Sequence, residues 1–127
     1  MINTLTTNLM NFIDASPTMF HTIASCKNIL ETESFCYLEP NKPWNLQVGG
    51  KYYTTLNDSA LIAFVINSND FINEGFKIIG THGDVPGFRI KPNAEMNTDG
   101  YVKLNTEGYG GAILSTWFDR PLSLAGR

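Results

Sequence analysis

The 127-residue sequence lacks the features that mark several large protein classes. It has 9 Lys and Arg against 12 Asp and Glu, and it shows no basic stripe with interleaved aromatic residues, which argues against a nucleic-acid-binding protein. No apolar run approaches the roughly 20 residues of a membrane-spanning helix, and residues 1–17 show neither the basic nor the apolar region of a signal peptide. We therefore predict a cytoplasmic protein that binds neither nucleic acid nor membranes.

Cysteine is equally scarce. The two cysteines, Cys26 and Cys36, match neither a zinc-binding pair nor a redox motif in their spacing. In a cytoplasmic chain we expect them to be free, small core residues. Hydrophobic residues make up 43% of the sequence and charged residues 17%, which is an ordinary globular composition, and the length suffices for one modest domain or for parts of two.

The first third of the sequence predicts two amphipathic helices. Apolar residues recur at steps of three and four, as Ile2, Leu5, Leu9 and Phe12 and then as Met19, Ile23, Cys26 and Leu30. We expect the first helix to end near Asp14. Ser16 is the expected cap of the second helix, with Pro17 at its first position.

Strand patterns follow the helices. Residues Lys51–Leu56 and Ala60–Ile66 predict neighbouring strands joined by a short turn that contains Asn and Asp. The run Phe76–Gly80 is apolar and closed by glycine, as expected of a strand buried on both faces of a mixed sheet. Helices followed by a mixed sheet indicate an α/β fold.

The composition changes beyond Pro92. Glycine and proline turns separate three further β-like segments, Tyr101–Glu107, Ala112–Phe118 and Leu122–Ala125. We therefore place a domain boundary near Lys91–Asn93. Residues 1–91 are predicted to form part of an α/β domain, and residues 92–127 the start of a β-rich domain that is still in strand at the last residue.

The residues most suited to chemistry directly follow the predicted strand Phe76–Gly80. Ligands of open α/β sheets bind at the carboxyl ends of strands, and His82 lies just past such an end. A neutral imidazole is a good ligand for zinc, cobalt or manganese, and Asp84, two residues along an extended chain, projects to the same side and can orient it. Taken alone, the triplet fits equally a capped turn with a solvated acid.

Four longer stretches surround this triplet. They are "DASPTMFH" at Asp14–His21, "PWNLQVGGKYY" at Pro43–Tyr53, "GTHGDVPGFRIKPN" at Gly80–Asn93 and "GYVKLNTEGYGGAILSTWFDRPLSLAGR" at Gly100–Arg127. Together they resemble the M18 family of metallo-aminopeptidases, the aspartyl aminopeptidase and aminopeptidase I group. The resemblance covers nearly the whole sequence, and the last two stretches are the most specific.

The resemblance implies a site and a reaction. His82 corresponds to the family's first metal-ligand histidine, and Asp84, our predicted catalytic residue, to the acid that supports and orients the metal centre. The family uses two divalent metal ions, usually zinc, with cobalt or manganese as alternatives, to activate a bridging water that attacks a peptide bond, with a glutamate as general base. Its remaining ligands come from sequence well downstream of Arg127. Gly83 departs from the family pattern, which usually has threonine there.

The resemblance also implies peptide substrates with acidic or neutral N-terminal residues, and a homo-oligomer. In the family, an inserted β-rich domain makes dimer contacts, and the dimers assemble into larger shells such as dodecamers. Residues 92–127 are similar to the start of that insertion. We expect these 127 residues alone to be inactive.

Other residues have simpler interpretations. We expect His21 to be a packed or partly exposed helix residue, Asp119 and Arg120 to form an ion pair or turn rather than an active-site rim, and Trp44 and Trp117 to anchor a core or interface. The glycine pairs at 49–50 and 110–111 are expected turn formers. Two other functions remain open: a non-catalytic assembly or regulatory module with the peptidase fold, and a metal-free ligand-binding α/β domain.

Overall fold

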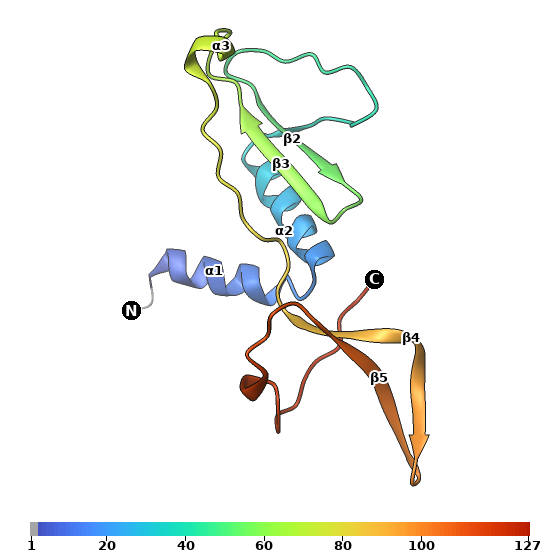
Figure 1. Ribbon diagram of the computed structural model, residues 1–127. Helices are drawn as coiled ribbons and strands as arrows, with labels where there is room; N and C mark the ends of the chain where they lie inside the picture. Colours follow the sequence, from blue (N-terminus) through green and yellow to red (C-terminus); the bar gives the residue numbers. More distant parts are fainter. Residues whose placement is uncertain (1–2) are drawn as a thin grey trace. The chain divides into compact units, whose positions relative to one another are not determined.

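The computed structural model describes residues 3–127, which form two compact units. The first unit comprises the chain up to Asp84 together with Ala125–Arg127, and the second comprises Val85–Leu124. The elements of the first unit are α1 (Thr4–Asp14), α2 (Met19–Thr32), β1 (Cys36–Tyr37), β2 (Lys51–Leu56), β3 (Ala60–Val65) and α3 (Phe71–Glu74) (Figure 1). Those of the second are β4 (Gly87–Thr98), β5 (Tyr101–Tyr109) and the 3-10 helix η1 (Leu114–Thr116). The predicted α/β class is confirmed.

The two N-terminal helices form where the apolar periodicity predicts them. Helix α1 ends at Asp14, as expected. Helix α2 begins later than predicted, because Thr18 rather than Ser16 is its cap: the Thr18 hydroxyl accepts a hydrogen bond from the backbone N–H of His21 at 3.4 Å. Pro17 lies ahead of the helix, and the Ser16 hydroxyl instead contacts the Ser25 hydroxyl at 3.1 Å. Among the described residues, none of the helices is long and apolar enough to cross a membrane.

Strands β1, β2 and β3 form one sheet in that order. β1 is parallel to β2, and β2 pairs antiparallel with β3 from Lys51 opposite Val65 to Leu56 opposite Ala60. The turn between them places Asn57 and Asp58 at positive φ, a conformation that Asn and Asp tolerate better than most residues. Both predicted strands and their turn are confirmed.

A small core joins α2 to this sheet. Its buried hydrophobic residues are Ile23, Tyr52, Tyr53 and Ile66. Tyr53 is only 1% exposed, and its hydroxyl donates a hydrogen bond to the Glu31 carboxylate on α2. Its ring also contacts Tyr37 of β1, with ring centroids 5.3 Å apart. Tyr53, a residue of β2, therefore contacts both helix α2 and strand β1.

The Tyr53 hydroxyl gives the stability of the first unit a defined pH dependence. Burial, assisted by the hydrogen bond to Glu31 and its negative charge, raises the pKa of Tyr53 to about 12. Because an unfolded tyrosine has a pKa of about 10, this contribution is fully present below pH 10 and is lost as the pH rises through 12. We expect Tyr53→Phe to lower the free energy of unfolding by about 1.5–3 kcal/mol at pH 7. We also expect the free energy of unfolding of this variant to fall less steeply than that of the wild type as the pH rises above 10.

Urea denaturation of the wild type and Tyr53→Phe between pH 7 and 12 measures this effect. Tyr101→Phe is the matched control, because Tyr101 is 71% exposed. An alkaline decline that is equally steep in wild type and Tyr53→Phe would contradict the assignment.

Gly50 is needed where the chain enters β2. A Cβ at this position would overlap the ring and hydroxyl of Tyr52. The Tyr52 ring is held in place on both sides: its hydroxyl accepts from the backbone N–H of Gln47 at 3.0 Å, and its centroid lies 5.7 Å from that of Phe64. The side chain thus has little room to move aside.

We expect Gly50→Ala to destabilise the protein by about 1–3 kcal/mol, the usual cost of overpacking. Gly126→Ala is the control, since nothing lies within 4 Å of a Cβ built there. Thermal or urea denaturation checks the difference. Equal stability of the two variants would show that the Tyr52 side chain moves aside without lowering the free energy of unfolding.

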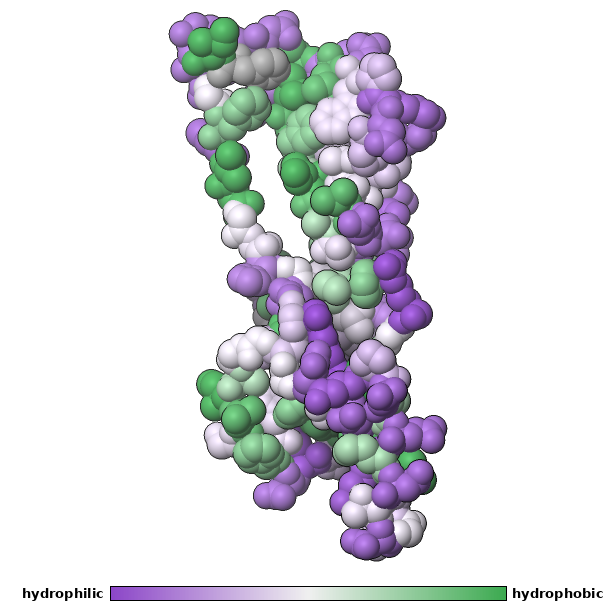
Figure 2. Space-filling model, turned by 45° about the vertical axis from the view of Figure 1, so that its right-hand side comes forward, coloured by the Kyte–Doolittle hydropathy of each residue, from purple (hydrophilic) through white to green (hydrophobic). Residues whose placement is uncertain are grey.

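The run Phe76–Gly80 does not form the predicted strand. It is extended, and neither sheet of the described residues includes it. Phe76, Ile78 and Ile79 are 71%, 86% and 92% exposed. Figure 2 shows the segment after α3 as a thin, mainly hydrophobic column. An apolar run becomes a buried strand only when a neighbouring strand and covering side chains are present, and β3 is the last strand of this sheet among residues 3–127.

The second unit is a hairpin followed by an irregular segment. β4 and β5 pair antiparallel across the two-residue turn Asp99–Gly100, where both residues have positive φ, as a type I′ turn requires. The register shifts between Ile90 and Glu95, so a bulge accommodates the proline at position 92 within a strand. The predicted strand over 101–107 is confirmed as part of β5.

Two expectations for this region differ from the structure. The compact unit begins at Val85 and β4 spans residues 91–93, and the predicted division of the chain into domains stays a prediction. The predicted strand over 112–118 is wrong, because this segment holds η1 and is anchored by Trp117, which packs edge-on against Phe88 at 5.5 Å. The predicted strand over 122–125 is also wrong. The assignment of residues 92–127 to a dimerisation insertion stays a prediction.

Candidate metal site

His82 and Asp84 lie together in the segment that follows Gly80, within the first unit. The His82 Nδ1 atom is 3.2 Å from the Asp84 Oδ1 atom. The two side chains differ in exposure: 93% for His82 and 31% for Asp84. The carboxylate is thus held near the chain while the imidazole projects into solvent.

This contact has a chemical consequence. When the Asp84 carboxylate accepts a hydrogen bond from Nδ1–H, the neutral His82 ring carries its lone pair on Nε2. A carboxylate behind an imidazole is the usual arrangement for orienting a metal-binding histidine and raising its basicity. The expected roles of the pair, Nε2 as ligand and Asp84 as its support, are compatible with this geometry and stay predictions.

A metal centre at His82 would need further ligands. A catalytic zinc takes three protein ligands, and a bridged pair of ions takes more. Within residues 3–127, no group of three or more His, Cys, Asp or Glu side chains is arranged to hold a metal ion. The donor chemistry of His82 is compatible with one ligand of a zinc site, and that role stays a prediction.

His21 takes part in a different arrangement. Its Nδ1 atom is 2.8 Å from the Thr18 hydroxyl, and the side chain is half-buried on α2, as expected of a packed or partly exposed helix residue. It also lines an open pocket of about 320 Å³ that the sequence did not predict. The other lining residues are Phe20, Ile23, Ala24, Lys27, Asp58 and Arg127. His82 is not among them.

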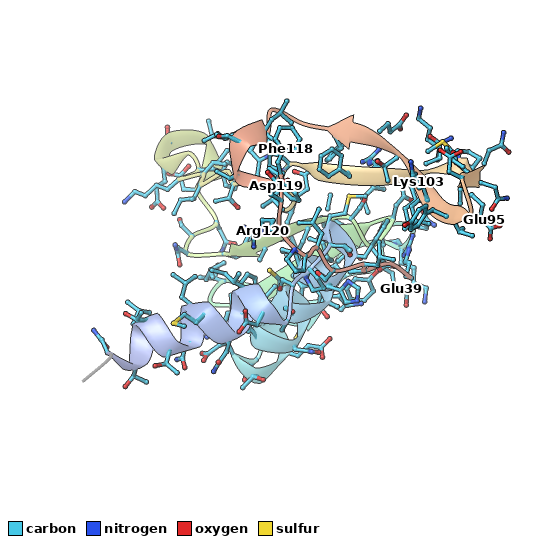
Figure 3. All side chains as sticks on the ribbon, turned by 90° about the horizontal axis from the view of Figure 1, so that it is seen from below. Glu39, Glu95, Lys103, Phe118, Asp119 and Arg120 are labelled. Atoms are coloured by element: carbon cyan, nitrogen blue, oxygen red, sulfur yellow. The ribbon has the colours of Figure 1, made fainter. Side chains whose placement is uncertain are left out.

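The remaining candidates are structural. Figure 3 shows Phe118, Asp119 and Arg120 in succession after η1. Asp119 has a positive φ of 56°, and the Arg120 guanidinium donates to the backbone oxygen of Thr116 at 3.4 Å, so the pair forms a turn, as expected. Trp44 donates its indole N–H to the backbone oxygen of Glu39 at 2.9 Å. Both cysteines are free, but Cys36 is exposed rather than in the core.

The glycine that departs from the family pattern sits in open space. Nothing lies within 4 Å of a Cβ built on Gly83, and its φ is outside the left-handed region. We expect Gly83→Thr to change the free energy of unfolding by less than about 1 kcal/mol, with any gain coming from a less flexible unfolded chain. A stiffer turn should also hold His82 more firmly.

Urea denaturation checks the stability, and zinc titration of the full-length protein checks metal binding, with Gly83→Ala as the variant that adds only a methyl group. Failure of Gly83→Thr to fold, or loss of its metal, would show that the site needs a backbone conformation that threonine cannot adopt.

Comparison with known proteins decides the family. Residues 12–127 match the family described as aminopeptidase I zinc metalloprotease (M18). The chain belongs to the M18 family. It is 53% identical over 120 residues to the probable M18 family aminopeptidase 2 of Clostridium novyi and 54% identical over 120 residues to that of Clostridium acetobutylicum. In each case the match covers 94% of this chain and 28% of the relative, so the chain spans little more than a quarter of these M18 proteins.

Solved M18 structures agree in fold. The S. cerevisiae mApe1 dodecamer superposes with a TM-score of 0.82 at 30% identity, covering 92% of this chain and 28% of that one. The crystal structure of yeast aminopeptidase 1 gives a TM-score of 0.82 at 29% identity, over 91% of this chain and 28% of that one. The M18 resemblance of the sequence is thereby confirmed, and these residues adopt the conformation of the corresponding part of larger M18 chains.

Proposed function

We propose that these 127 residues act as the N-terminal portion of a metal-dependent M18 aminopeptidase that releases acidic or neutral N-terminal residues from peptides. The observation that supports this most strongly is the contact between His82 Nδ1 and Asp84 Oδ1 at 3.2 Å, inside a segment that matches a zinc metalloprotease family. It leaves the Nε2 atom of an exposed imidazole available to a metal ion.

Each residue of the pair has a defined task in this proposal. His82 binds a divalent ion through Nε2, and Asp84 retains the proton on Nδ1 and fixes the plane of the ring. Two such ions, zinc in the first place and cobalt or manganese as alternatives, would supply a water of lowered pKa for attack on the peptide carbonyl. The acidic ligands and the general base belong to polypeptide beyond residue 127.

The experiment is an aminopeptidase assay of the full-length protein. Peptides with Asp, Glu, Leu or Ala at the N-terminus are incubated with protein stripped by a chelator and then resupplied with zinc, cobalt or manganese. We expect release of the N-terminal residue to stop on stripping and to return with at least one metal. Persistent activity in the stripped protein would contradict metal dependence.

A non-catalytic assembly or regulatory module is the second candidate. The lack of a three-ligand metal cluster within residues 3–127 is the observation that favours it. The two candidates differ in the full-length protein: the peptidase binds metal through His82, and the module does not. The first check is whether the reading frame continues past Arg127 into acidic metal-ligand motifs.

We further propose a cytoplasmic homo-oligomer built from dimers. Support for the oligomer comes from the mApe1 neighbour, which is a dodecamer. Sedimentation analysis of the full-length protein measures its state, and a monomer at micromolar concentration would contradict this part of the proposal.

A further inference from the structure

The open pocket of about 320 Å³ in the first unit lies along one face of α2. Phe20, Ile23, Ala24 and Lys27 are three, four and seven residues apart, so they share that face of the helix. The turn between β2 and β3 and the segment Ala125–Arg127, which belongs to the same unit, complete the lining. Small-molecule sites usually measure about 300–1,000 Å³, so this pocket fits a small ligand.

Two opposite charges lie side by side at the pocket. The Arg127 Nη1 atom is 3.7 Å from the Asp58 Oδ2 atom, and both side chains are more than half exposed. This separation exceeds the length of an N–H···O hydrogen bond, about 2.7–3.2 Å. The Arg127 guanidinium is instead held over the Phe20 ring, with Cζ 3.7 Å from the ring centroid. Both charged groups therefore keep hydrogen-bonding capacity for a ligand.

A second cation, Lys27, lines the same pocket. Its side chain is half-buried, yet it makes no hydrogen bond or ion pair within residues 3–127. Partial burial of an unpaired ammonium group costs free energy, which an anionic group of a ligand would offset. The pocket thus combines two cations and one carboxylate with an apolar surface on α2.

We propose that this pocket binds a free α-amino acid with an apolar side chain. Lys27 and Arg127 bind its carboxylate, Asp58 binds its ammonium group, and the apolar residues of α2 contact its side chain. The two charged groups of an amino acid are neighbours, as the charges of Arg127 and Asp58 are. A ligand with negative charge alone is disfavoured because Asp58 repels it.

Free amino acids are also what an aminopeptidase releases. That link to the pocket rests on the proposed function, whereas the binding itself does not. Isothermal titration calorimetry of the full-length protein, stripped of metal by a chelator, measures binding without hydrolysis. Failure of this proposal is therefore distinguishable from failure of the proposed function.

We expect leucine to bind with a Kd of about 1 mM or lower. Leucinamide lacks the carboxylate and N-acetyl-leucine lacks the ammonium group, so each should bind at least about 5-fold more weakly than leucine. Inorganic phosphate is the probe for a simple anion site. No leucine binding at millimolar concentration, equal binding of either derivative, or tighter binding of phosphate would each overturn the proposal.

Two variants locate the binding. Lys27→Gln and Asp58→Asn each remove one charge, and Asn tolerates the positive φ of 53° at position 58. We expect each variant to bind leucine at least about 5-fold more weakly than the wild type. Lys103→Gln is the matched control, because Lys103 lies on β5 and does not line the pocket. Unchanged leucine affinity in either charge variant would overturn the proposal. Circular dichroism checks their folding, and if a variant does not fold, the leucine derivatives test the same contact in the wild type.

Discussion

His82→Ala in the full-length protein is expected to abolish aminopeptidase activity with little change in fold. The side chain is 93% exposed, so its removal leaves no cavity and should alter the free energy of unfolding by less than about 0.5 kcal/mol. The same removal deletes a proposed metal ligand. Loss of a residue that only supports a ligand typically lowers metal affinity about 10–100-fold. We therefore expect His82→Ala to lower metal affinity by at least about 100-fold.

A graded series separates the two roles. Asp84→Asn keeps the size of the side chain but weakens its hydrogen bond with His82 Nδ1. We expect an intermediate loss of about 10–100-fold in metal affinity. His21→Ala is the matched control, because His21 is the other histidine of the chain and contacts Thr18 rather than the proposed site. Zinc content after dialysis and kcat/KM are measured for each. Full activity and unchanged zinc content in His82→Ala would refute the assignment.

The second large effect concerns the isolated chain: residues 1–127 alone should not hydrolyse peptides. One imidazole cannot hold two metal ions, and within residues 3–127 no group of three ligands is present to hold even one. The exposed apolar run at 76–79 and the open edge of β3 should also make the isolated chain prone to associate.

The assay compares the purified 127-residue chain with the full-length protein at equal molar concentration, with zinc, cobalt or manganese added. Chelator-sensitive turnover by the short chain at a rate comparable to that of the full-length protein would mean that the active site lies elsewhere. Size-exclusion chromatography of the same samples reports association.

Local signals in the sequence were sufficient for much of the fold. The periodicity of α1 and α2 predicted both helices, and Asn57 with Asp58 marked the hairpin turn between β2 and β3, because these residues tolerate positive φ. These elements depend on contacts between residues close in sequence. For that reason a single sequence was enough to place them.

The errors arose where distant contacts decide the structure. β4 continues past the Pro at position 92 through a shift in register between Ile90 and Glu95, which the sequence pattern did not predict. Phe76–Gly80 has a strand pattern but belongs to neither sheet of residues 3–127, and no local pattern reveals whether a partner strand is in place. Trp117 packs against Phe88, which is distant in sequence. The segment around η1 adopts a conformation that allows this contact instead of the strand that its β propensity favours.

The candidate site was predictable only in part. His82 and Asp84 are two residues apart, and their spacing alone indicated that they would share one side of an extended chain. The remaining ligands of a dinuclear centre would be distant in sequence, so neither the pattern nor the fold of these residues identifies them. This chain covers 28% of the length of each of the two Clostridium M18 relatives.

The most direct measurement is anomalous X-ray diffraction at the zinc edge from crystals of the full-length protein loaded with zinc. We predict an anomalous peak about 2.0–2.1 Å from the Nε2 atom of His82, with Asp84 hydrogen-bonded to Nδ1 on the opposite side of the ring. Zinc bound elsewhere while the His82 imidazole stays in solvent would contradict the account.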